Sequence, residues 1–174
     1  MKNKKTLDLT LTALFTVIIC ICSWLSIPSA VPFTLQTFAI FLALLVLGGK
    51  RGTTATVLYI LLGAVGLPVF HSFTGGIGIL TGPSGGYITG FLLLALTYRI
   101  IIKKAGEKLF AKAFVLVIGL IICYIAGSLQ FALVTDISFK TAVLTCVIPF
   151  ILPDTVKLIL SILLSVKLNK INRI

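Results

Sequence analysis

Two side chains of opposite charge, Asp154 and Lys157, stand three residues apart inside the apolar stretch 141–168. Residues at this spacing share one face of a helix, and charges at membrane depth face a cavity or each other because their burial is costly. Pro153 directly before the pair predicts a helix start, where N–H groups favour an anionic ligand. The carboxylate can accept ligand N–H bonds, and the ammonium can donate to a carbonyl or carboxylate. The pattern favours a ligand site; the alternative is a capping Asp154 that also neutralises Lys157.

The loop 68–87 (PVFHSFTGGIGILTGPSGGY) is rich in glycine, mostly apolar, and therefore unlike a solvated linker. Glycine permits close approach to the backbone, so we expect a lid whose N–H groups and Tyr87 contact a ligand. A turn-rich connector is the alternative, and Gly86 with Gly90 also forms a small-xxx-small pair that favours helix packing. His71, the only histidine, has its ordinary interpretation as a hydrogen-bonded or solvated side chain, with a ligand contact as the alternative.

A second loop, 28–36, contains two prolines and leads into Gln36 and Thr37. We expect this loop on the same membrane face as the glycine-rich loop. Gln36 is therefore a candidate ligand contact, with an interfacial glutamine as the alternative.

The elements that must position these residues are apolar stretches. Their approximate bounds are 6–27, 34–49, 53–67, 84–102, 113–134 and 141–168. The composition, 59% apolar and 11% charged with a mean hydropathy of +1.20, leaves too little polar surface for a water-soluble globule. We expect an all-α integral membrane protein with six transmembrane helices, forming one domain over 1–174.

Two of the expected spans have special features. The stretches 34–49 and 53–67 are short, which indicates tilt, local thinning of the bilayer or help from adjoining loops. The last stretch contains Pro149 and Pro153, so we expect a proline break near 149–153, with a short segment before it and a regular helix starting near Pro153.

Basic residues gather at one side of this topology. They are Lys2, Lys4, Lys5, Lys50, Arg51, Arg99, Lys103, Lys104, Lys108, Lys112, Lys167, Lys170 and Arg173. The loops of the other side hold only Lys140, so the positive-inside rule predicts a cell-membrane protein with both termini cytoplasmic. The net charge of +11 is explained by these basic residues at the cytoplasmic side, so we expect no nucleic-acid partner. The apolar stretch after MKNKK exceeds the usual signal-peptide length, so we expect it to remain as the first span.

Several chemistries are excluded by missing motifs. The chain has no G-x-x-x-x-G-K-[ST], H-E-x-x-H or G-x-S-x-G pattern, and it contains four acidic residues and one histidine. We therefore expect neither an enzyme nor an ATPase. The four cysteines fall in apolar stretches, which indicates packing rather than a disulfide framework, and no metal or cofactor is expected.

Four runs of the sequence carry a family resemblance. They are 31–37 (VPFTLQT), 63–70 (GAVGLPVF), 80–87 (LTGPSGGY) and 153–157 (PDxxK). Together, and in this order, they resemble the biotin-specific S components, the BioY type, of energy-coupling factor transporters. The resemblance covers nearly the whole chain.

The resemblance implies an S-component-type bundle of six helices. Such a subunit captures biotin near the outer face under the first and third loops, topples in the membrane, and delivers biotin inward. Its implied partners are the lipid bilayer, a transmembrane T component and two ABC-type ATPases, in agreement with the missing P-loop. Alternatives are an S component for another small vitamin, a membrane enzyme, and a structural membrane subunit without a transport role.

Residue roles follow from the resemblance. Asp154 would accept the ureido N–H bonds of biotin, and Lys157 would donate either to the ureido carbonyl or to the carboxylate. The remaining implied ligand contacts are polar (Gln36, Ser84 and Tyr87), backbone approaches (Gly82, Gly85 and Gly86) and apolar walls (Phe33 and Phe70). S components carry Ala-x-x-x-Ala on helix one where they meet the T component. Here Ala13-x-x-x-Val17, with Thr12 and Thr16 beside it, stands in that place, and the valine departs from the pattern.

Overall fold

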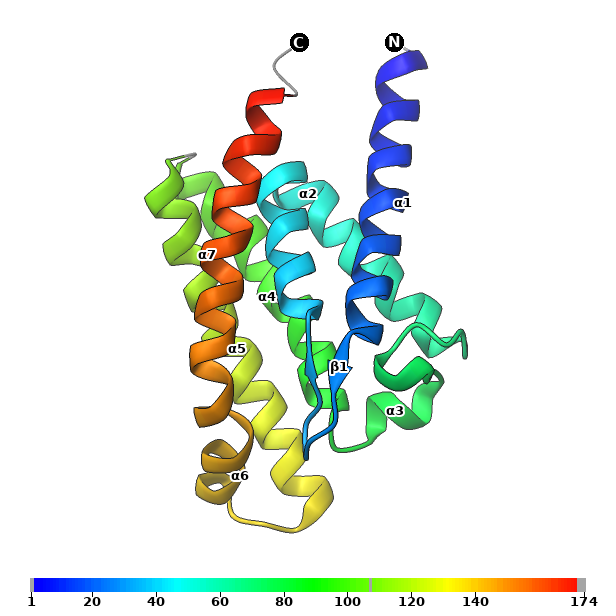
Figure 1. Cartoon of the computed structure of the whole chain (residues 1–174), viewed down its shortest axis with the longest axis vertical. Helices are drawn as coiled ribbons and strands as arrows, with labels where there is room; N and C mark the ends of the chain where they lie inside the picture. Colours follow the sequence, from blue (N-terminus) through cyan, green and yellow to red (C-terminus); the bar gives the residue numbers. More distant parts are fainter. Residues whose placement is uncertain (1, 107, 172–174) are drawn as a thin grey trace.

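The computed structural model describes residues 2–106 and 108–171, which fold into a bundle of long helices (Figure 1). The elements in chain order are α1 (Lys2–Trp24), β1 (Ser26–Ile27), β2 (Phe33–Thr34), α2 (Gln36–Ala64), η1 (His71–Phe73), α3 (Ile77–Thr81), α4 (Gly85–Ala105), α5 (Leu109–Thr135), α6 (Phe139–Cys146) and α7 (Ile148–Ile171). The beginning of α1 and the end of α7 lie at the same end of the bundle (Figure 1). Glu107 and Arg173 lie outside the described residues.

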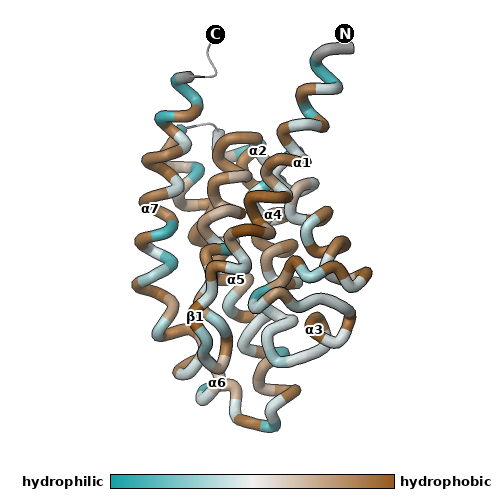
Figure 2. The backbone as a smooth tube through the Cα atoms, turned by 45° about the vertical axis from the view of Figure 1, so that its right-hand side comes forward, coloured by the Kyte–Doolittle hydropathy of each residue, from teal (hydrophilic) through white to brown (hydrophobic). Residues whose placement is uncertain are grey.

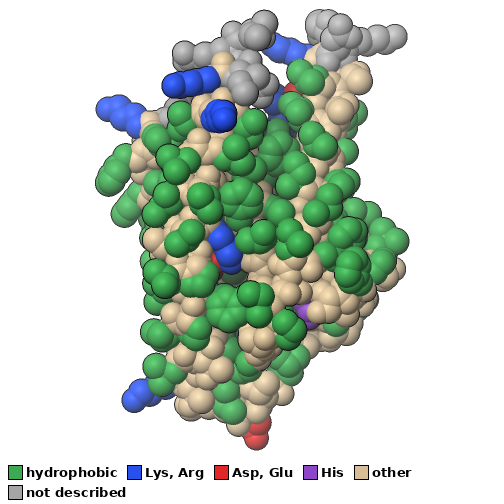
Figure 3. All heavy atoms as spheres, in the orientation of Figure 1, with side chains coloured by type: hydrophobic (Ala, Val, Ile, Leu, Met, Phe, Trp, Pro, Cys, Tyr) green, Lys and Arg blue, Asp and Glu red, His purple; other side chains and the backbone are tan. Residues whose placement is uncertain are grey.

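Among the described residues, five helices are long and apolar enough to cross a membrane: α1, α2, α4, α5 and α7. Figure 2 shows apolar residues along these helices, with hydrophilic residues at the outer ends of α1 and α7 and at a patch partway along α7. In Figure 3, apolar side chains cover the middle of the visible face and most basic ones lie at the end where α7 finishes. This distribution is what a helical membrane protein requires.

Helix α2 covers most of both stretches predicted at 34–49 and 53–67. It is broken at Gly48, whose φ of 77° and ψ of 170° are non-helical and which glycine adopts without a Cβ clash. Figure 1 shows one arm of α2 rising from β2 to this break and the other descending from it toward α3. The sequence therefore predicted two apolar arms where the structure has one broken helix, and six crossings remain a prediction that needs both arms to span.

The predicted helix start near Pro153 is wrong. The break after α6 falls at Val147, and α7 already begins at Ile148 with Pro153 inside it. Pro149 stands in the first turn, where its missing N–H would have no helical acceptor in any case. Pro153 removes only the bond to the Pro149 carbonyl, and the helix continues past this single loss.

The first arm of α2 forms the centre of the bundle. Ala39, Ile40, Phe41 and Leu44 are fully buried, because α2 packs against α1, α4 and α7 while α4 packs against α5. Large apolar side chains remain exposed on the outer helices, including Phe110 at 84% and Leu133 at 75%. A helix that is buried all round reads as continuously apolar, whereas the outer helices carry lipid-facing leucines and phenylalanines.

The two loops that the sequence singled out have defined structures. The first is an antiparallel hairpin in which β1 pairs with β2, with Ser26 opposite Thr34 and Ile27 opposite Phe33. The second contains η1 and α3. At the other end of the bundle, an ion pair of 2.9 Å between Asp8 and Arg51 ties α1 to α2 beyond its break.

Candidate ligand-binding site

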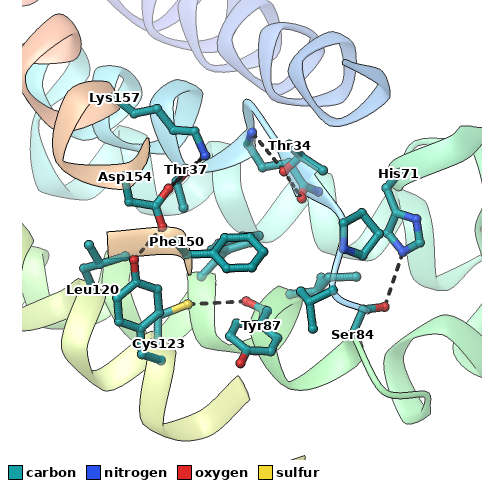
Figure 4. Close-up of a pocket in the computed structure, with 16 residues that line it drawn as sticks. Thr34, Thr37, His71, Ser84, Tyr87, Leu120, Cys123, Phe150, Asp154 and Lys157 are labelled. Atoms are coloured by element: carbon teal, nitrogen blue, oxygen red, sulfur yellow. Dashed lines mark hydrogen bonds and ion pairs between the residues drawn. The ribbon is translucent and has the colours of Figure 1, made fainter. Parts of the chain in front are cut away.

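A partly open cavity lies between the hairpin, the glycine-rich loop and the helices (Figure 4), and its empty volume, with the space at its opening included, is about 500 Å³. Its lining residues are Val31, Pro32, Thr34, Gln36, Thr37, His71, Ser84, Tyr87, Ile88, Phe91, Leu120, Cys123, Tyr124, Phe150, Asp154 and Lys157. The combination of apolar walls with a few convergent polar groups is typical of small-molecule sites. Five of the ten predicted ligand contacts line it: Gln36, Ser84, Tyr87, Asp154 and Lys157.

Asp154 is the centre of a buried polar cluster. Its Oδ1 accepts hydrogen bonds from Thr37 Oγ1 and from Lys157 Nζ, both at 2.8 Å, and its Oδ2 accepts one from Tyr124 OH at 2.6 Å. The Lys157 ammonium also donates to Thr37 Oγ1 at 3.1 Å. Asp154 is 2% exposed and Lys157 8%. The pair thus neutralises itself inside the protein, as a buried ion pair must.

The cluster retains capacity for a ligand. A carboxylate offers about four lone-pair directions and an ammonium three protons. Three of these acceptor directions on Asp154 are used, and two of the Lys157 protons are used, by partners among the described residues. One acceptor direction at Oδ2 and one donor at Nζ are therefore left for a molecule in the cavity.

Gln36 belongs to a second polar group at the start of α2. Its Oε1 accepts from Thr34 Oγ1 at 2.8 Å, and its Nε2 donates to Tyr59 OH. Tyr59 is buried and packs edge-on against Phe70, with ring centroids 5.5 Å apart. These contacts fix the orientation of the Gln36 amide before any ligand arrives, and one amide proton is left over.

Tyr87 reaches the cavity from the first turn of α4. Its hydroxyl lies 3.2 Å from Ser128 Oγ on α5 and donates to the Cys146 carbonyl at 3.4 Å. Its ring packs directly on Gly127, where a Cβ would lie only 2.3 Å from a ring carbon. The absent side chain at Gly127 is therefore what lets Tyr87 lie flat against α5.

His71 and Ser84 form a third polar group, on the side of the cavity away from Asp154 and Lys157 (Figure 4). The His71 Nε2 lies 3.3 Å from Ser84 Oγ. Its Nδ1 is buried and has no hydrogen-bond partner among the described residues. Burial lowers the pKa of His71 below its ordinary value, because desolvation disfavours the imidazolium.

Each loop is fastened to the helices beside the cavity. The Phe33 ring of the hairpin stacks on Phe150 of α7, with centroids 4.0 Å apart and an interplanar angle of 5°. The side chain of Gln130 on α5 donates to the carbonyls of Leu80 and Gly82, at 2.7 and 2.9 Å, and so holds the glycine-rich loop. Both loops therefore cover the cavity in the way that lids would.

The other five predicted contacts do not line the cavity. Phe33 stacks on Phe150, and Phe70 is fully buried in the core, where its ring occupies the space left by Gly63. The glycines of the lid approach protein rather than the cavity. Gly82 binds Gln130, a Cβ on Gly85 would lie 1.9 Å from the Leu80 carbonyl oxygen, and one on Gly86 would lie 2.8 Å from the Ala126 carbonyl oxygen.

Sequence reasoning missed Thr37, Tyr124 and Phe150. Thr37 stands beside Gln36 in the run 31–37 and was within reach of the same argument. Tyr124 and Phe150 carried no local signal, because their importance depends on α5 and α7 lying beside each other.

The four residues proposed as a partner face on α1 divide between two faces. Thr12 and Thr16 are 6% and 4% exposed, and Thr16 Oγ1 bonds the Thr12 carbonyl and, at 3.3 Å, the Ala55 carbonyl. They pack against α2, which leaves little of either side chain exposed to a partner. Ala13 and Val17 are exposed, Val17 at 53%.

The part of the chain that the structure describes holds no group of three His, Cys, Asp or Glu side chains able to bind a metal ion. The four cysteines are buried thiols. Cys123 lines the cavity, and its thiol donates to the Tyr87 carbonyl at 3.6 Å.

Comparison with known proteins gives a consistent result. A relative from Thermotoga maritima, named biotin transporter BioY, is 41% identical over 160 residues, which cover 91% of this chain and 93% of the relative. A relative from Pyrococcus horikoshii, named probable biotin transporter BioY, is 34% identical over 95% of this chain and 98% of its own length.

A solved structure and a family model extend the similarity to the whole fold. The crystal structure of the S-component for biotin from an ECF-type ABC transporter superposes with a TM-score of 0.89 at 29% identity, covering 98% of this chain and 94% of that one. The model of the BioY family matches residues 1–173. The chain therefore belongs to the BioY family.

Proposed function

We propose that this multi-pass membrane protein is a substrate-binding subunit that captures biotin in the cavity described above. The observation that carries the proposal is the buried cluster of Asp154, Lys157, Thr37 and Tyr124 at the wall of a mostly apolar cavity. Ionic groups in such a place are costly, and the cluster retains one acceptor and one donor that face no protein partner among the described residues.

The chemistry of biotin matches these free positions. Its ureido ring offers two N–H donors and one carbonyl acceptor beside an apolar thiophane ring and a valerate tail. Asp154 Oδ2 is suited to accept a ureido N–H, and the remaining Lys157 proton is suited to the ureido carbonyl. Ile88, Phe91 and Leu120 supply apolar surface for the ring and tail.

The wider assembly follows from the family. We infer that the chain forms one transmembrane domain over 1–174, with both arms of α2 crossing the bilayer, so that six crossings leave both termini cytoplasmic. It works with a transmembrane T component and two ABC-type ATPases and performs no ATP hydrolysis itself. Of the four residues expected to contact the T component, Ala13 and Val17 lie on the exposed face of α1.

The alternatives predict different sites. An S component for another small vitamin keeps the lids and changes the preferred ligand. A purely structural subunit has no use for a cavity with unfilled polar capacity, and the Asp154 cluster argues against it. An enzyme needs a second acid, base or nucleophile beside Asp154. The tyrosines and Cys123 there are hydrogen-bonded to protein, and Lys157 is paired with Asp154 itself.

The test is equilibrium binding of biotin to the purified, detergent-solubilised chain, with riboflavin and thiamin as control ligands. Biotin binding alone, with a matching rise in unfolding temperature, supports the proposal. Binding of another vitamin in place of biotin supports the first alternative. A folded protein that binds none of the three contradicts the proposal.

A further inference from the structure

We propose that His71 is the binding partner of the substrate's carboxylate, at the side of the cavity away from Asp154 and Lys157. This inference rests on the proposed function, since it names the part of biotin that each side of the cavity receives. It assigns the ureido ring to the Asp154–Lys157 pair. It also assigns a direct ligand contact to the single histidine, whose ordinary interpretation is a hydrogen-bonded or solvated side chain.

The first observation is an unsatisfied atom. His71 Nδ1 is buried without a partner among the described residues, although its other ring nitrogen lies 3.3 Å from Ser84 Oγ. Buried polar atoms in native proteins nearly always have a partner, and the cost of leaving one unpaired is large. His71 lines the cavity, so a molecule bound in the cavity comes close to the His71 side chain.

The second observation is that the protein holds His71 in place through its backbone. The His71 carbonyl accepts from Thr74 Oγ1 at 2.7 Å and from the Thr74 amide at 3.2 Å, and the Phe70 amide donates to the Thr74 carbonyl at 2.9 Å. Ser72 and Phe73 have φ of 55° and 57°, in the left-handed region that non-glycine residues rarely adopt. This turn fixes the His71 backbone without using the ring nitrogens, of which Nε2 lies near Ser84 Oγ and Nδ1 has no partner among the described residues.

The third observation is the distribution of charge. Among the described lining residues the charged side chains are Asp154 and Lys157, which pair with each other, so the side near His71 carries no fixed charge. The titratable side chains of the surrounding helices include Cys20 and Cys22 of α1, Tyr59 of α2, Tyr87 of α4, and Cys123 and Tyr124 of α5. Thiols and phenols are ordinarily protonated up to about pH 8. An incoming carboxylate therefore has one group able to provide a positive charge there, the imidazole.

This arrangement couples binding to proton uptake. In the empty cavity burial lowers the pKa of His71, so the ring is neutral at pH 7. A bound carboxylate stabilises the imidazolium and raises that pKa. Biotin affinity therefore rises as the pH falls from about 8 to about 5.5, a range in which a carboxylate such as the substrate's stays ionised.

The experiment compares biotin with biotinamide, which keeps the rings and tail and lacks the charge. Affinities are measured between pH 5.5 and 8 for the unmodified protein, His71→Gln and His71→Ala, with Thr81→Ala as a control from the exposed side of the same loop. The unmodified protein and Thr81→Ala should bind biotin roughly tenfold more tightly at pH 5.5 than at pH 8, and biotinamide equally at both. His71→Ala should lose about 10- to 100-fold in biotin affinity at pH 5.5.

His71→Gln separates charge from shape. It should abolish the pH dependence and most of the preference for biotin over biotinamide while it keeps the unfolding temperature. If both His71 variants retain biotin affinity within twofold, or if the pH dependence survives in them, the inference is overturned and the proposed function stands. If the folded, unmodified protein binds biotin at no pH, both are overturned. The ligand comparison on the unmodified protein needs no variant, so a variant that fails to fold leaves the test intact.

Discussion

Replacing Asp154 by Asn removes one charge from the polar cluster and keeps the size of the side chain. The carboxylate accepts three hydrogen bonds, from Thr37, Lys157 and Tyr124. An amide offers one oxygen and turns an NH₂ group, which is a donor, toward at least one of these three donors. Asp154→Asn therefore leaves Lys157 buried at 8% exposure without its counter-charge and leaves a further donor facing a donor.

The expected magnitude follows from these contacts. Removing one partner of a buried ion pair costs about 3–5 kcal/mol of folding stability, which corresponds to a fall in unfolding temperature of roughly 6–20 °C for a chain of this length. Each ligand N–H that loses a charged acceptor weakens binding by about 1.5–3 kcal/mol, or about 10- to 150-fold. Both quantities should fall together in Asp154→Asn.

The double variant Asp154→Asn with Lys157→Met separates folding from binding. It removes both charges, so no ion remains unpaired, and folding stability should return to within about 1–2 kcal/mol of the unmodified protein. Biotin affinity should stay as low as in Asp154→Asn, because the acceptor is still missing. The assay is thermal unfolding in detergent together with equilibrium biotin binding on the same four proteins: unmodified, both single variants and the double variant.

Two results would refute this reasoning. Recovery of biotin affinity in the double variant would mean that the pair acts only by keeping the helix folded. Unchanged unfolding temperature and unchanged affinity in Asp154→Asn would mean that the cluster is accessible to water and does not contact the ligand.

Three further changes test the surroundings of the cavity. Gly127→Ala should destabilise the fold by about 1–3 kcal/mol, seen as a lower unfolding temperature, because its Cβ would lie 2.3 Å from the Tyr87 ring; a neutral result would contradict the packing described. Gln130→Leu should release the glycine-rich loop from α5 and speed biotin dissociation roughly fivefold to tenfold in a stopped-flow assay, and an unchanged rate would argue against a lid. Phe33→Ala should remove the ring stacked at 4.0 Å on Phe150 and weaken biotin binding by about 0.5–1.5 kcal/mol in equilibrium titration, whereas an unchanged affinity would separate the hairpin from the site.

The polar centre of the site could be predicted from sequence because its cost is local. A carboxylate and an ammonium in an apolar stretch need polar partners wherever that stretch folds. Asp154 and Lys157 could therefore be recognised from the sequence as a buried polar pair. The partners could not be found in this way. Tyr124 is an ordinary residue of an apolar helix until α5 brings its hydroxyl to 2.6 Å from Asp154.

Glycine and phenylalanine were harder to interpret, since the same residue types serve ligand contact and packing. The close approach predicted at Gly85 and Gly86 exists, but its partners are the Leu80 carbonyl and the backbone of α5. Phe70 fills the space above Gly63 in the core. A single sequence does not show which neighbouring group packs against a glycine. The roles of the two glycines and of Phe70 could therefore be assigned only from the tertiary structure.

The positions of the helices could be predicted more accurately than the points at which they begin or break. The composition predicted a helical membrane bundle, and the long helices follow the apolar stretches closely, as in α4 and α5. The helix start near Pro153 was misplaced because proline disfavours a helix interior by a few kcal/mol, and this local penalty is smaller than the packing of a whole helix against α2. The break at Gly48 was only partly foreseen, as a short loop between two arms.

One stripe of α7 joins the hairpin to the polar cluster. Phe150, Asp154 and Lys157 follow one another at spacings of four and three residues, which places them on a single helical face. Phe150 supports the Phe33 ring, and the next turns carry the acid and the base. A ligand that binds Asp154 and Lys157 therefore contacts the same helical face against which the hairpin packs. We therefore expect hairpin position and ligand binding to be energetically linked, although Phe33 itself does not line the cavity.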